Sequence, residues 1–331
     1  MPCRSGSRCC GRRRFPLERL PQPDEAHLRS TWRQAKVSRI EKGLALSQQR
    51  NPGGWYVIGA SEDVGRTTSI VRSIGGVEVV LWRDSSGALV AGPGECPHMG
   101  ASLAAGVVND SVLYCRWHGY EVDARGTREW QPFPALDDGV LLWVRLGTAG
   151  EAPLDRPVIC ERPPLGESLS AVIAIPGTCE PKDIVANRLD PWHGAWFHPY
   201  AFSHLTVDDA ASTDEELLVD VAFRLNRTWG IPVRARFTCP DARTIVMHIV
   251  EGEGAGSVVE THATPMGINR DGQHRTMMVE ATIAYSPRTG FQLTRHLSPL
   301  LKPMVRRTAR QLWVDDLVYA ERRYQLRSRR V

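Results

Sequence analysis

Four residues in the first half of the chain have the chemistry of metal ligands. Cys96, His98, Cys115 and His118 form two Cys-His pairs, spaced as Cys-x-His, sixteen residues, and then Cys-x-x-His. Thiolates and imidazoles are ligands for zinc and for iron–sulfur centres. A glycine follows each pair, and glycine lets the backbone approach a bulky inorganic group closely. We therefore expect both pairs to hold one metal centre.

Two kinds of centre fit these ligands. Structural zinc sites usually pair cysteine with cysteine and histidine with histidine at short spacing, whereas each half here contains one of each. The mixed halves suit a cluster of two irons and two sulfides, with both cysteines on one iron and both histidines on the other. Neutral imidazoles in place of thiolates would raise the potential of such a cluster. Zinc remains the alternative.

A second segment, "NRLDPWHGAWFHPY", contains one aspartate and two histidines among large aromatic residues. By itself such a stretch is more often an ordinary part of a core or surface than a ligand set. A one-electron centre upstream would need an acceptor, however, and His193 and His198 lie five positions apart. An irregular helix could bring both to one side. Two histidines and one carboxylate on one face of iron leave the opposite face open for dioxygen and substrate.

The two regions together resemble a known family. "CPHMGASL" and "CRWHGYEVDARG" resemble the two loops of the Rieske motif. The string Asn-x-x-Asp-x-x-His-x-x-x-x-His is similar to the iron-binding segment of Rieske non-haem iron oxygenases, in their catalytic (alpha-type) subunit. The resemblance runs from about Trp55 to Gln325. It implies a [2Fe-2S] cluster in which the two cysteines ligate one iron and the two histidines of the loops ligate the other.

The same resemblance implies roles in the second segment. His193 and His198 match the ligands of one mononuclear Fe(II). Asp190 matches the acidic residue that connects the two metal centres by hydrogen bonding between a cluster-ligating histidine and an iron-ligating histidine. Asn187 matches a polar residue near the iron, whose role varies in the family.

A third iron ligand must come from a distant part of the chain. "QLWVDDLVYAERRYQ" offers Asp315 and Asp316. In the family, the ligand aspartate commonly precedes a helical glutamate by five positions, and Glu321 then selects Asp316. Either aspartate could instead be an acidic helix start that the helix dipole favours.

The resemblance implies an oxygenase component. Electrons would pass from the cluster to the mononuclear iron, which would activate O2 and hydroxylate, dealkylate or desaturate a small hydrophobic molecule. No Gly-x-Gly-x-x-Gly follows a strand, so a separate reductase or ferredoxin would supply the electrons. Family members usually form head-to-tail rings, and we expect a homotrimer. The alternatives are a Rieske electron-transfer protein with a degenerate, iron-free second domain, and a binding module held by zinc.

The pattern of elements predicts an α+β chain. Residues 1–50 form a basic leader, partly disordered or helical. Residues 51–150 contain short β-like runs and are expected to form an all-β Rieske domain. Residues 151–331 are expected to form a catalytic domain with an antiparallel sheet flanked by helices. Its last element, from Phe291 to about Arg323, has helical periodicity, which Pro299 and Pro303 are expected to interrupt early.

Composition narrows the setting. The net charge of +4 is small, and no basic stripe with interleaved aromatics appears, so we expect no nucleic-acid partner. No apolar run is long enough to span a membrane. No apolar stretch follows the arginines near the start, as an export signal would require, and the eight cysteines are not spaced as a disulfide framework. These features predict a cytoplasmic protein, and the use of arginine over lysine predicts a bacterial source.

Overall fold

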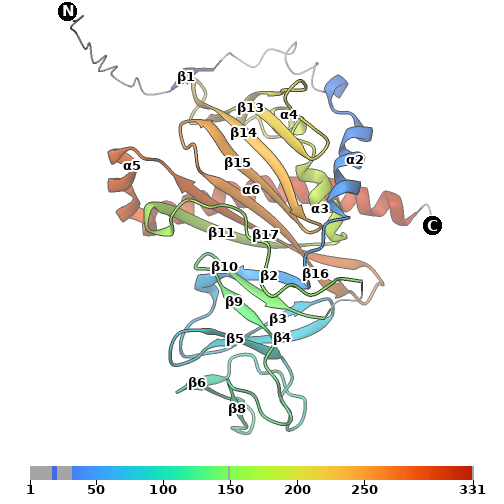
Figure 1. Cartoon of the computed structure of the whole chain (residues 1–331), viewed down its shortest axis with the longest axis vertical. Coiled ribbons are helices and arrows are strands. Elements are labelled where there is room, and N and C mark those ends of the chain that lie inside the picture. The colour runs from blue at the N-terminus through green and yellow to red at the C-terminus, as the bar shows by residue number, and fades with distance from the viewer. Residues whose placement is uncertain (1–16, 21–31, 148–149, 330–331) are drawn as a thin grey trace, which may run out of the picture.

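Two β-rich parts follow one another along the chain in the computed structural model, which describes residues 17–20, 32–147 and 150–329. The N-terminal domain, residues 55–145, contains three small sheets, and the C-terminal domain contains one large sheet with helices against it (Figure 1). The predicted α+β organisation, with an all-β domain before a domain that combines an antiparallel sheet and helices, is confirmed. Most of the predicted basic leader lies outside the described residues.

Short antiparallel strands build the N-terminal domain. Its sheets have the orders β2-β10-β9, β3-β4-β5 and β6-β7-β8, and a turn of 3-10 helix at Ser61–Asp63 follows β2. The strands are β2 Trp55–Ala60, β3 Ile70–Ile74, β4 Val77–Arg83, β5 Leu89–Pro93, β6 Val107–Asn109, β7 Val112–Tyr114, β8 Glu121–Asp123, β9 Ala135–Asp137 and β10 Leu141–Arg145. The two Cys-His loops connect β5 to β6 and β7 to β8.

One antiparallel sheet of eight strands forms the framework of the C-terminal domain. Its order is β11-β17-β16-β15-β14-β13-β12, and the short β1 also pairs with β14. The strands are β1 Glu18–Arg19, β11 Ser168–Gly177, β12 Phe202–Val207, β13 Glu216–Arg224, β14 Trp229–Asp241, β15 Thr244–Gly252, β16 Val258–Ile268 and β17 His274–Tyr285. Buried and less buried residues alternate along β13 and β14, as expected where one face of a sheet packs on a core.

Helices pack against this sheet. They are α2 Val37–Ser47, α3 Pro181–Arg188, α4 His193–Phe197, α5 Thr289–Thr294 and α6 Ser298–Ser328, with 3-10 turns at Leu165–Glu167 and Arg295–Leu297. Ile40 and Leu44 of α2 join the same apolar cluster as Val185 of α3, so this part of the leader contributes to the core of the C-terminal domain. Among the described residues, no helix has the length and apolar character needed to cross a membrane.

The long helix α6 differs from expectation. Pro299 and Pro303 were expected to interrupt the last element early, but α6 continues through Pro303 to Ser328, so this prediction is wrong at Pro303. Pro299 lies in the first turn, where the backbone N–H groups have no helical partner in any case. Pro303 removes a single hydrogen bond one turn later, and the packed remainder of the helix tolerates that loss.

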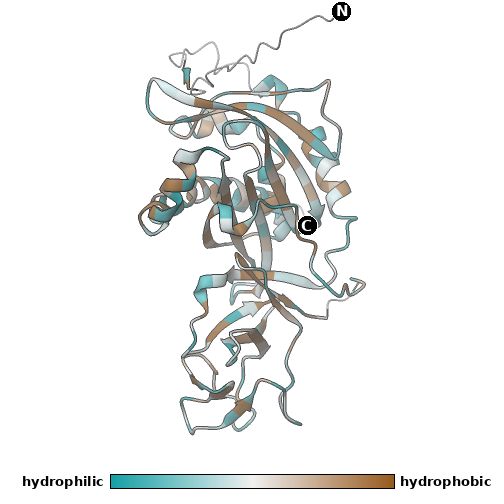
Figure 2. Ribbon diagram, turned by 60° about the vertical axis from the view of Figure 1, so that its left-hand side comes forward, coloured by the Kyte–Doolittle hydropathy of each residue, from teal (hydrophilic) through white to brown (hydrophobic). Residues whose placement is uncertain are grey.

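The two domains share an apolar interface. Every residue of β2 is buried because Tyr56 and Ile58 pack in the N-terminal domain, while Trp55 and Val57 pack against strands of the C-terminal sheet, including Val279 on β17. Figure 2 shows hydrophobic residues concentrated along the strands of both domains and hydrophilic residues in the connecting loops. The interface fixes the orientation of one domain relative to the other.

A buried ion-pair network reinforces this interface. Arg162, in the connection between the domains, places its Nη1 2.9 Å from Asp138 Oδ2 and its Nη2 2.7 Å from Glu260 Oε2. His262 Nε2 lies 3.2 Å from the same Glu260 oxygen. Burial raises the pKa of Glu260, but His262 and Arg162 outweigh this effect and lower the pKa to about 2. The network therefore connects the N-terminal domain, the linker and β16.

We expect Arg162→Met to lower the free energy of unfolding by about 3–5 kcal/mol, because it removes the guanidinium that pairs with both Asp138 and Glu260. Thermal or urea denaturation measures this loss. Arg125→Met, which removes an ion pair between exposed Arg125 and Asp123, is the control and should leave the melting temperature unchanged. Equal melting temperatures for Arg162→Met and the wild type would contradict a stabilising role for the network.

The loss of stability in Arg162→Met should become smaller at low pH. The pKa of Glu260 in the folded protein, about 2, lies below its ordinary value of 4.5. Its contribution to stability is therefore complete above pH 4.5 and is lost as the pH falls toward 2. The difference in free energy of unfolding between the wild type and Arg162→Met should become smaller over that pH range.

Candidate functional site

The two Cys-His loops have the same backbone hydrogen bonds. The Gly100 N–H donates to Cys96 O at 2.8 Å and the Gly119 N–H donates to Cys115 O at 2.9 Å. The N–H of each cysteine, in turn, donates to the carbonyl of the residue five positions later. Both glycines have positive φ, +71° and +69°, a conformation that residues with a Cβ rarely adopt. The sequence thus builds two loops with matching backbone turns, although the histidine stands two positions after the cysteine in the first and three in the second.

The ligand types separate by burial in these loops. Cys96 and Cys115 are 3% and 2% exposed, whereas His98 and His118 lie at the surface. The two imidazole rings lie nearly perpendicular to each other, edge to face, with centroids 5.1 Å apart. Burial raises the pKa of Cys96, and the neighbouring Cys115 raises it further, so a cation between the thiols would favour the thiolates. The four side chains could hold a cluster with its cysteine side inside and its histidine side outward.

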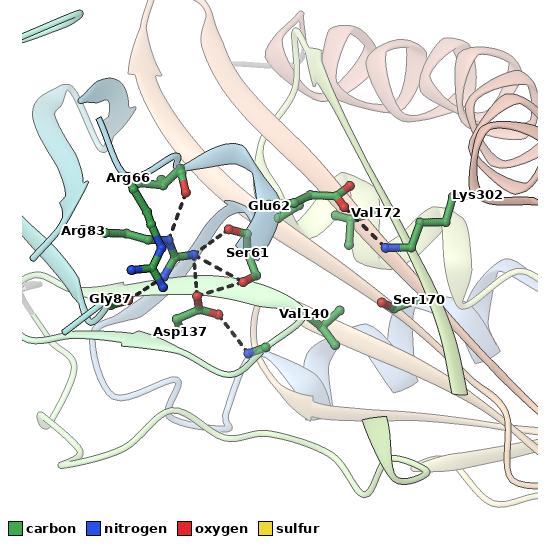
Figure 3. Close-up of a pocket in the computed structure, with 13 residues that line it drawn as sticks. Ser61, Glu62, Arg66, Arg83, Gly87, Asp137, Val140, Ser170, Val172 and Lys302 are labelled. Carbon is green, nitrogen blue, oxygen red and sulfur yellow. Dashed lines mark hydrogen bonds and ion pairs between the residues drawn. The ribbon is translucent and has the colours of Figure 1, made fainter. Parts of the chain in front are cut away.

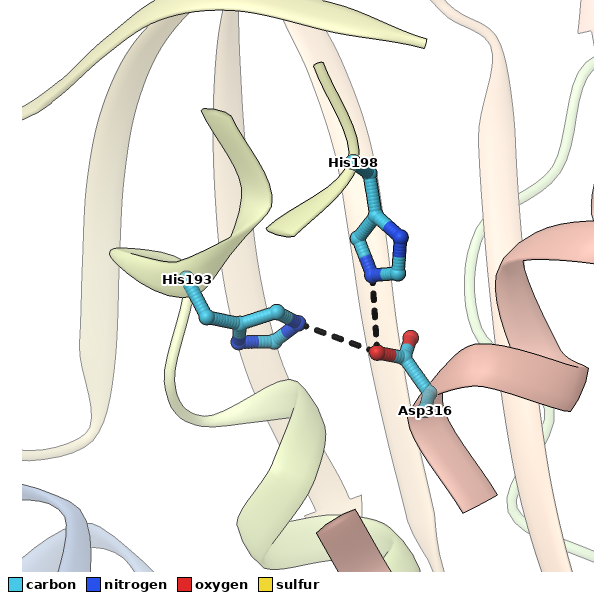
Figure 4. Close-up of side chains that lie close together, drawn as sticks. All are labelled: His193, His198 and Asp316. Atoms are coloured by element: carbon cyan, nitrogen blue, oxygen red, sulfur yellow. Dashed lines mark hydrogen bonds and ion pairs between the residues drawn. The ribbon is translucent and has the colours of Figure 1, made fainter. Parts of the chain in front are cut away.

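The second segment meets α6 in a compact group of three side chains. His193 begins α4, His198 follows its end, and Asp316 comes from α6 (Figure 4). The backbone leaves the helix at His198, with φ −118° and ψ 55°, and both imidazoles point toward the carboxylate. Asp316 Oδ1 lies 3.2 Å from His193 Nε2 and 2.8 Å from His198 Nε2. The three ligand atoms all lie within 4.8 Å of one another.

This group has the donors and the spacing of a mononuclear metal site. Ligands bound at right angles on a first-row metal at about 2.1 Å lie about 3 Å apart, as Asp316 Oδ1 does from each histidine nitrogen. Burial lowers the pKa of His193, but the carboxylates of Asp190 and Asp316 outweigh it and raise the pKa to about 9. Burial raises the pKa of Asp316, but the two histidines hold it well below its usual range. A divalent cation could take the place of the proton on His193.

The other residues expected here take separate positions. Asp190 is 8% exposed, and its Oδ2 lies 3.8 Å from His193 Nδ1, behind the ring and too far for a hydrogen bond. Asn187 is fully buried, and neither polar atom of its side chain has a partner among the described residues. Asp315, the alternative to Asp316, lies on the other side of His198, with its Oδ2 3.8 Å from His198 Nδ1, and accepts a hydrogen bond from the Tyr200 hydroxyl at 2.6 Å.

A small cavity of about 50 Å³ lies next to the three side chains. Its apolar lining comes mainly from the sheet and α6: Phe202, Leu205, Val219, Val221, Phe223, Phe237, Met247 and Leu312. Arg188 is the one arginine or lysine in its lining, and its Nη2 is paired with Glu280 at 2.6 Å. The alternation of apolar and polar residues along β13 could have identified the three lining residues on that strand, Val219, Val221 and Phe223.

A larger cavity, of about 440 Å³, lies at the junction of the two domains and is separate from this group (Figure 3). Its charged residues are largely paired with one another. Arg83 Nη2 lies 2.7 Å from Asp137 Oδ2, and Lys302 Nζ lies 3.4 Å from Glu62 Oε2. It lacks a set of converging metal ligands, and we assign the chemistry to the smaller cavity.

Comparisons with known families match both parts of the chain. Residues 54–139 match the model of the Rieske [2Fe-2S] domain, and residues 148–331 match a model described as a domain of unknown function (DUF5914). The chain is 28% identical over 207 residues to the 5,5'-dehydrodivanillate O-demethylase oxygenase subunit of Sphingobium sp.. That alignment covers 52% of this chain and 47% of the relative, so the chain spans about half of the relative's length.

Solved structures share the fold across most of the chain. Dicamba monooxygenase bound to dicamba superposes with a TM-score of 0.62 at 17% identity, covering 84% of this chain and 88% of that one. An oxygenase and ferredoxin complex of carbazole 1,9a-dioxygenase superposes with a TM-score of 0.53 at 13% identity, covering 91% of this chain and 87% of that one. The likeness in fold therefore extends over both domains of this chain.

Proposed function

This chain belongs to the DUF5914 family and carries a Rieske [2Fe-2S] domain, and we propose that it is the oxygenase component of a system that oxidises a small apolar molecule with O2. The predicted membership of the Rieske non-haem iron oxygenases, as an alpha-type subunit, is confirmed. The observation that carries the activity is the convergence of His193, His198 and Asp316 beside an apolar cavity, in a chain that also contains the cluster loops.

The residues divide into two ligand sets. Cys96, His98, Cys115 and His118 would hold the cluster, and His193, His198 and Asp316 would hold one Fe(II). When bound, these groups would supply electron storage at the cluster and O2 activation at the Fe(II). The choice of Asp316 over Asp315 rests on position, because only Asp316 points its carboxylate between the two imidazoles.

The surrounding residues would determine what reacts. Phe202, Phe223 and Leu312 line the cavity with apolar surface that excludes water and favours a hydrophobic substrate. Arg188 adds little net charge because Glu280 neutralises it. The cavity of about 50 Å³ is smaller than typical ligand pockets of roughly 300 Å³ or more, so we propose that the lining moves apart when substrate binds.

We also propose a separate electron donor. The described elements include no parallel sheet with crossover helices of the kind that binds dinucleotides. The ferredoxin in the carbazole 1,9a-dioxygenase complex makes a small iron–sulfur protein a reasonable donor here. We place the protein in the cytoplasm, where reducing conditions keep thiols available for the cluster.

The arrangement of the two sites supports a homotrimer. In Figure 1, the loops beside β6 and β8 lie at the end of the molecule away from α4. Electrons would have to cross most of one chain, whereas a neighbouring chain could bring its cluster next to Asp190. Large apolar side chains are exposed at both places: Met99 and Trp117 in the loops, and Trp196 and Phe197 in α4. We propose that these surfaces meet in a head-to-tail ring.

The purified wild-type protein tests this function directly. We expect a coloured protein with about three irons per chain, two in the cluster and one at the mononuclear site. Light scattering should show three chains per particle. About two irons per chain would favour an electron-transfer protein with an iron-free second domain, and a colourless zinc protein would exclude both functions.

A further inference from the structure

The nitrogen of His198 that faces away from Asp316 has its own hydrogen-bonded support. His198 is 1% exposed, and its Nδ1 lies 3.2 Å from the Tyr200 hydroxyl oxygen. The Tyr200 hydroxyl in turn donates to Asp315 Oδ2 at 2.6 Å. The three groups therefore form a connected line from the buried ring to a carboxylate near the surface.

The donors and acceptors in this line have one consistent direction. If His198 Nε2 binds a metal, its lone pair faces the metal and the proton of the neutral ring sits on Nδ1. That N–H can donate only to the lone pair of the Tyr200 oxygen, because the hydroxyl proton is directed to Asp315.

We propose that Tyr200 and Asp315 are positioning residues that hold His198 in the metal-binding tautomer and orientation. This inference rests on the proposed function, since it assigns a role at the same metal site. Groups that hydrogen-bond to ligand histidines fix their tautomer and raise their basicity. The sequence places the support beside the ligands, because Tyr200 follows His198 by two positions and Asp315 precedes Asp316.

His193 and His198 differ in whether their Nδ1 atom has a hydrogen-bond partner. Behind His193, the Asp190 carboxylate lies at 3.8 Å, and His193 Nδ1 has no hydrogen-bond partner among the residues described. Behind His198, the phenol bridges the gap to its carboxylate. Tyr200 is 40% exposed, so removing its hydroxyl should affect the ligand more than the stability of the fold.

The test uses the full-length protein with its cluster in place, the mononuclear site emptied with a chelator and Co2+ as the probe. We expect Tyr200→Phe to weaken Co2+ binding about 10- to 100-fold, and Asp315→Asn about tenfold. The double variant should bind no more weakly than Tyr200→Phe, because the line is already broken. Tyr319→Phe is the matched control. Tyr319 is 37% exposed and stacks on His193, and its hydroxyl has no hydrogen bond to a described residue.

A second measurement separates positioning from general loosening of the site. In the Co2+-loaded protein, the Nδ1–H proton of each ligand histidine gives a strongly shifted NMR signal that exchanges with water. Tyr200→Phe should speed the exchange of the His198 proton and leave the His193 signal unchanged, while Tyr319→Phe should change neither rate. Asp315→Asn gives a second reading if Tyr200→Phe folds poorly.

The outcomes are distinct. Wild-type affinity and unchanged exchange in both Tyr200→Phe and Asp315→Asn would overturn the positioning role while leaving the proposed function intact. A wild-type protein that binds no Co2+ in a manner dependent on His198 would overturn the proposed function, and the positioning role with it.

Discussion

Asp316→Ala should leave about two irons per chain and reduce O2-dependent turnover by roughly a thousandfold or more. Asp316 supplies the negative charge of the proposed ligand set, and its Oδ1 lies within 3.2 Å of both histidine nitrogens. Alanine removes both the charge and the donor atom. The two imidazoles that remain offer a divalent cation too few ligands for tight binding.

Iron analysis and the visible spectrum measure this effect together. The colour of the cluster should persist in Asp316→Ala, because its proposed ligands lie in the other domain. Asp155→Ala is the control, since the Asp155 side chain is fully exposed in the connection between the domains. If Asp316→Ala retained a third iron and wild-type turnover, the proposed ligand set would be incorrect.

Asp190→Asn should retain both metals and still reduce turnover by about 100-fold. The side chain of Asp190 lies behind His193, 3.8 Å from its Nδ1, and is nearly buried. In the proposed ring it would contact a cluster histidine of the neighbouring chain. Asparagine keeps the shape of the side chain and removes the charge that would orient the imidazoles of His193 and of the cluster histidine. The path for electrons would then be impaired while both ligand sets stay intact.

Rapid mixing distinguishes this effect from loss of iron. The cluster is reduced first, O2 and substrate are added, and its visible absorption reports reoxidation. In Asp190→Asn, reoxidation should be slow although iron analysis gives the wild-type value. Asp208→Asn, on the surface beside Arg234, serves as the control for removal of one carboxylate charge. Reoxidation of Asp190→Asn at the wild-type rate would mean that Asp190 does not connect the two centres.

The sequence predicted most where the chemistry is local. The cluster loops are short, and their ligands and turn glycines lie within a few positions of one another, so spacing alone identifies them. His193 and His198 were also evident from one segment. The choice between Asp315 and Asp316 came from resemblance, because neighbouring helical residues point in directions about 100° apart and only the packing of α6 decides which one faces α4.

Contacts between distant parts of the chain could not be predicted from the sequence. In the sequence, Tyr200 is only one of several large aromatic residues in its segment, because its hydroxyl meets Asp315 across more than a hundred positions. Arg162 lies in the irregular connection between the domains, yet it is buried between carboxylates of both domains. Trp196 and Phe197 belong to the same aromatic segment as the two histidines, but more than 40% of each is exposed. Such features depend on the register of strands and helices, which periodicity does not determine.

The helix that supplies Asp316 also makes contact with the other domain. Lys302 Nζ lies 3.4 Å from Glu62 Oε2, and Arg306 pairs with the same carboxylate. Lys302 precedes Asp316 by roughly 21 Å along the axis of α6, which is one continuous helix. Helix α6 thus connects Glu62 of the N-terminal domain with Asp316. A change in the angle between the two domains would therefore also move the Asp316 carboxylate. A chimaera with a different N-terminal domain would need a carboxylate at position 62 to keep α6, and with it Asp316, in the same position.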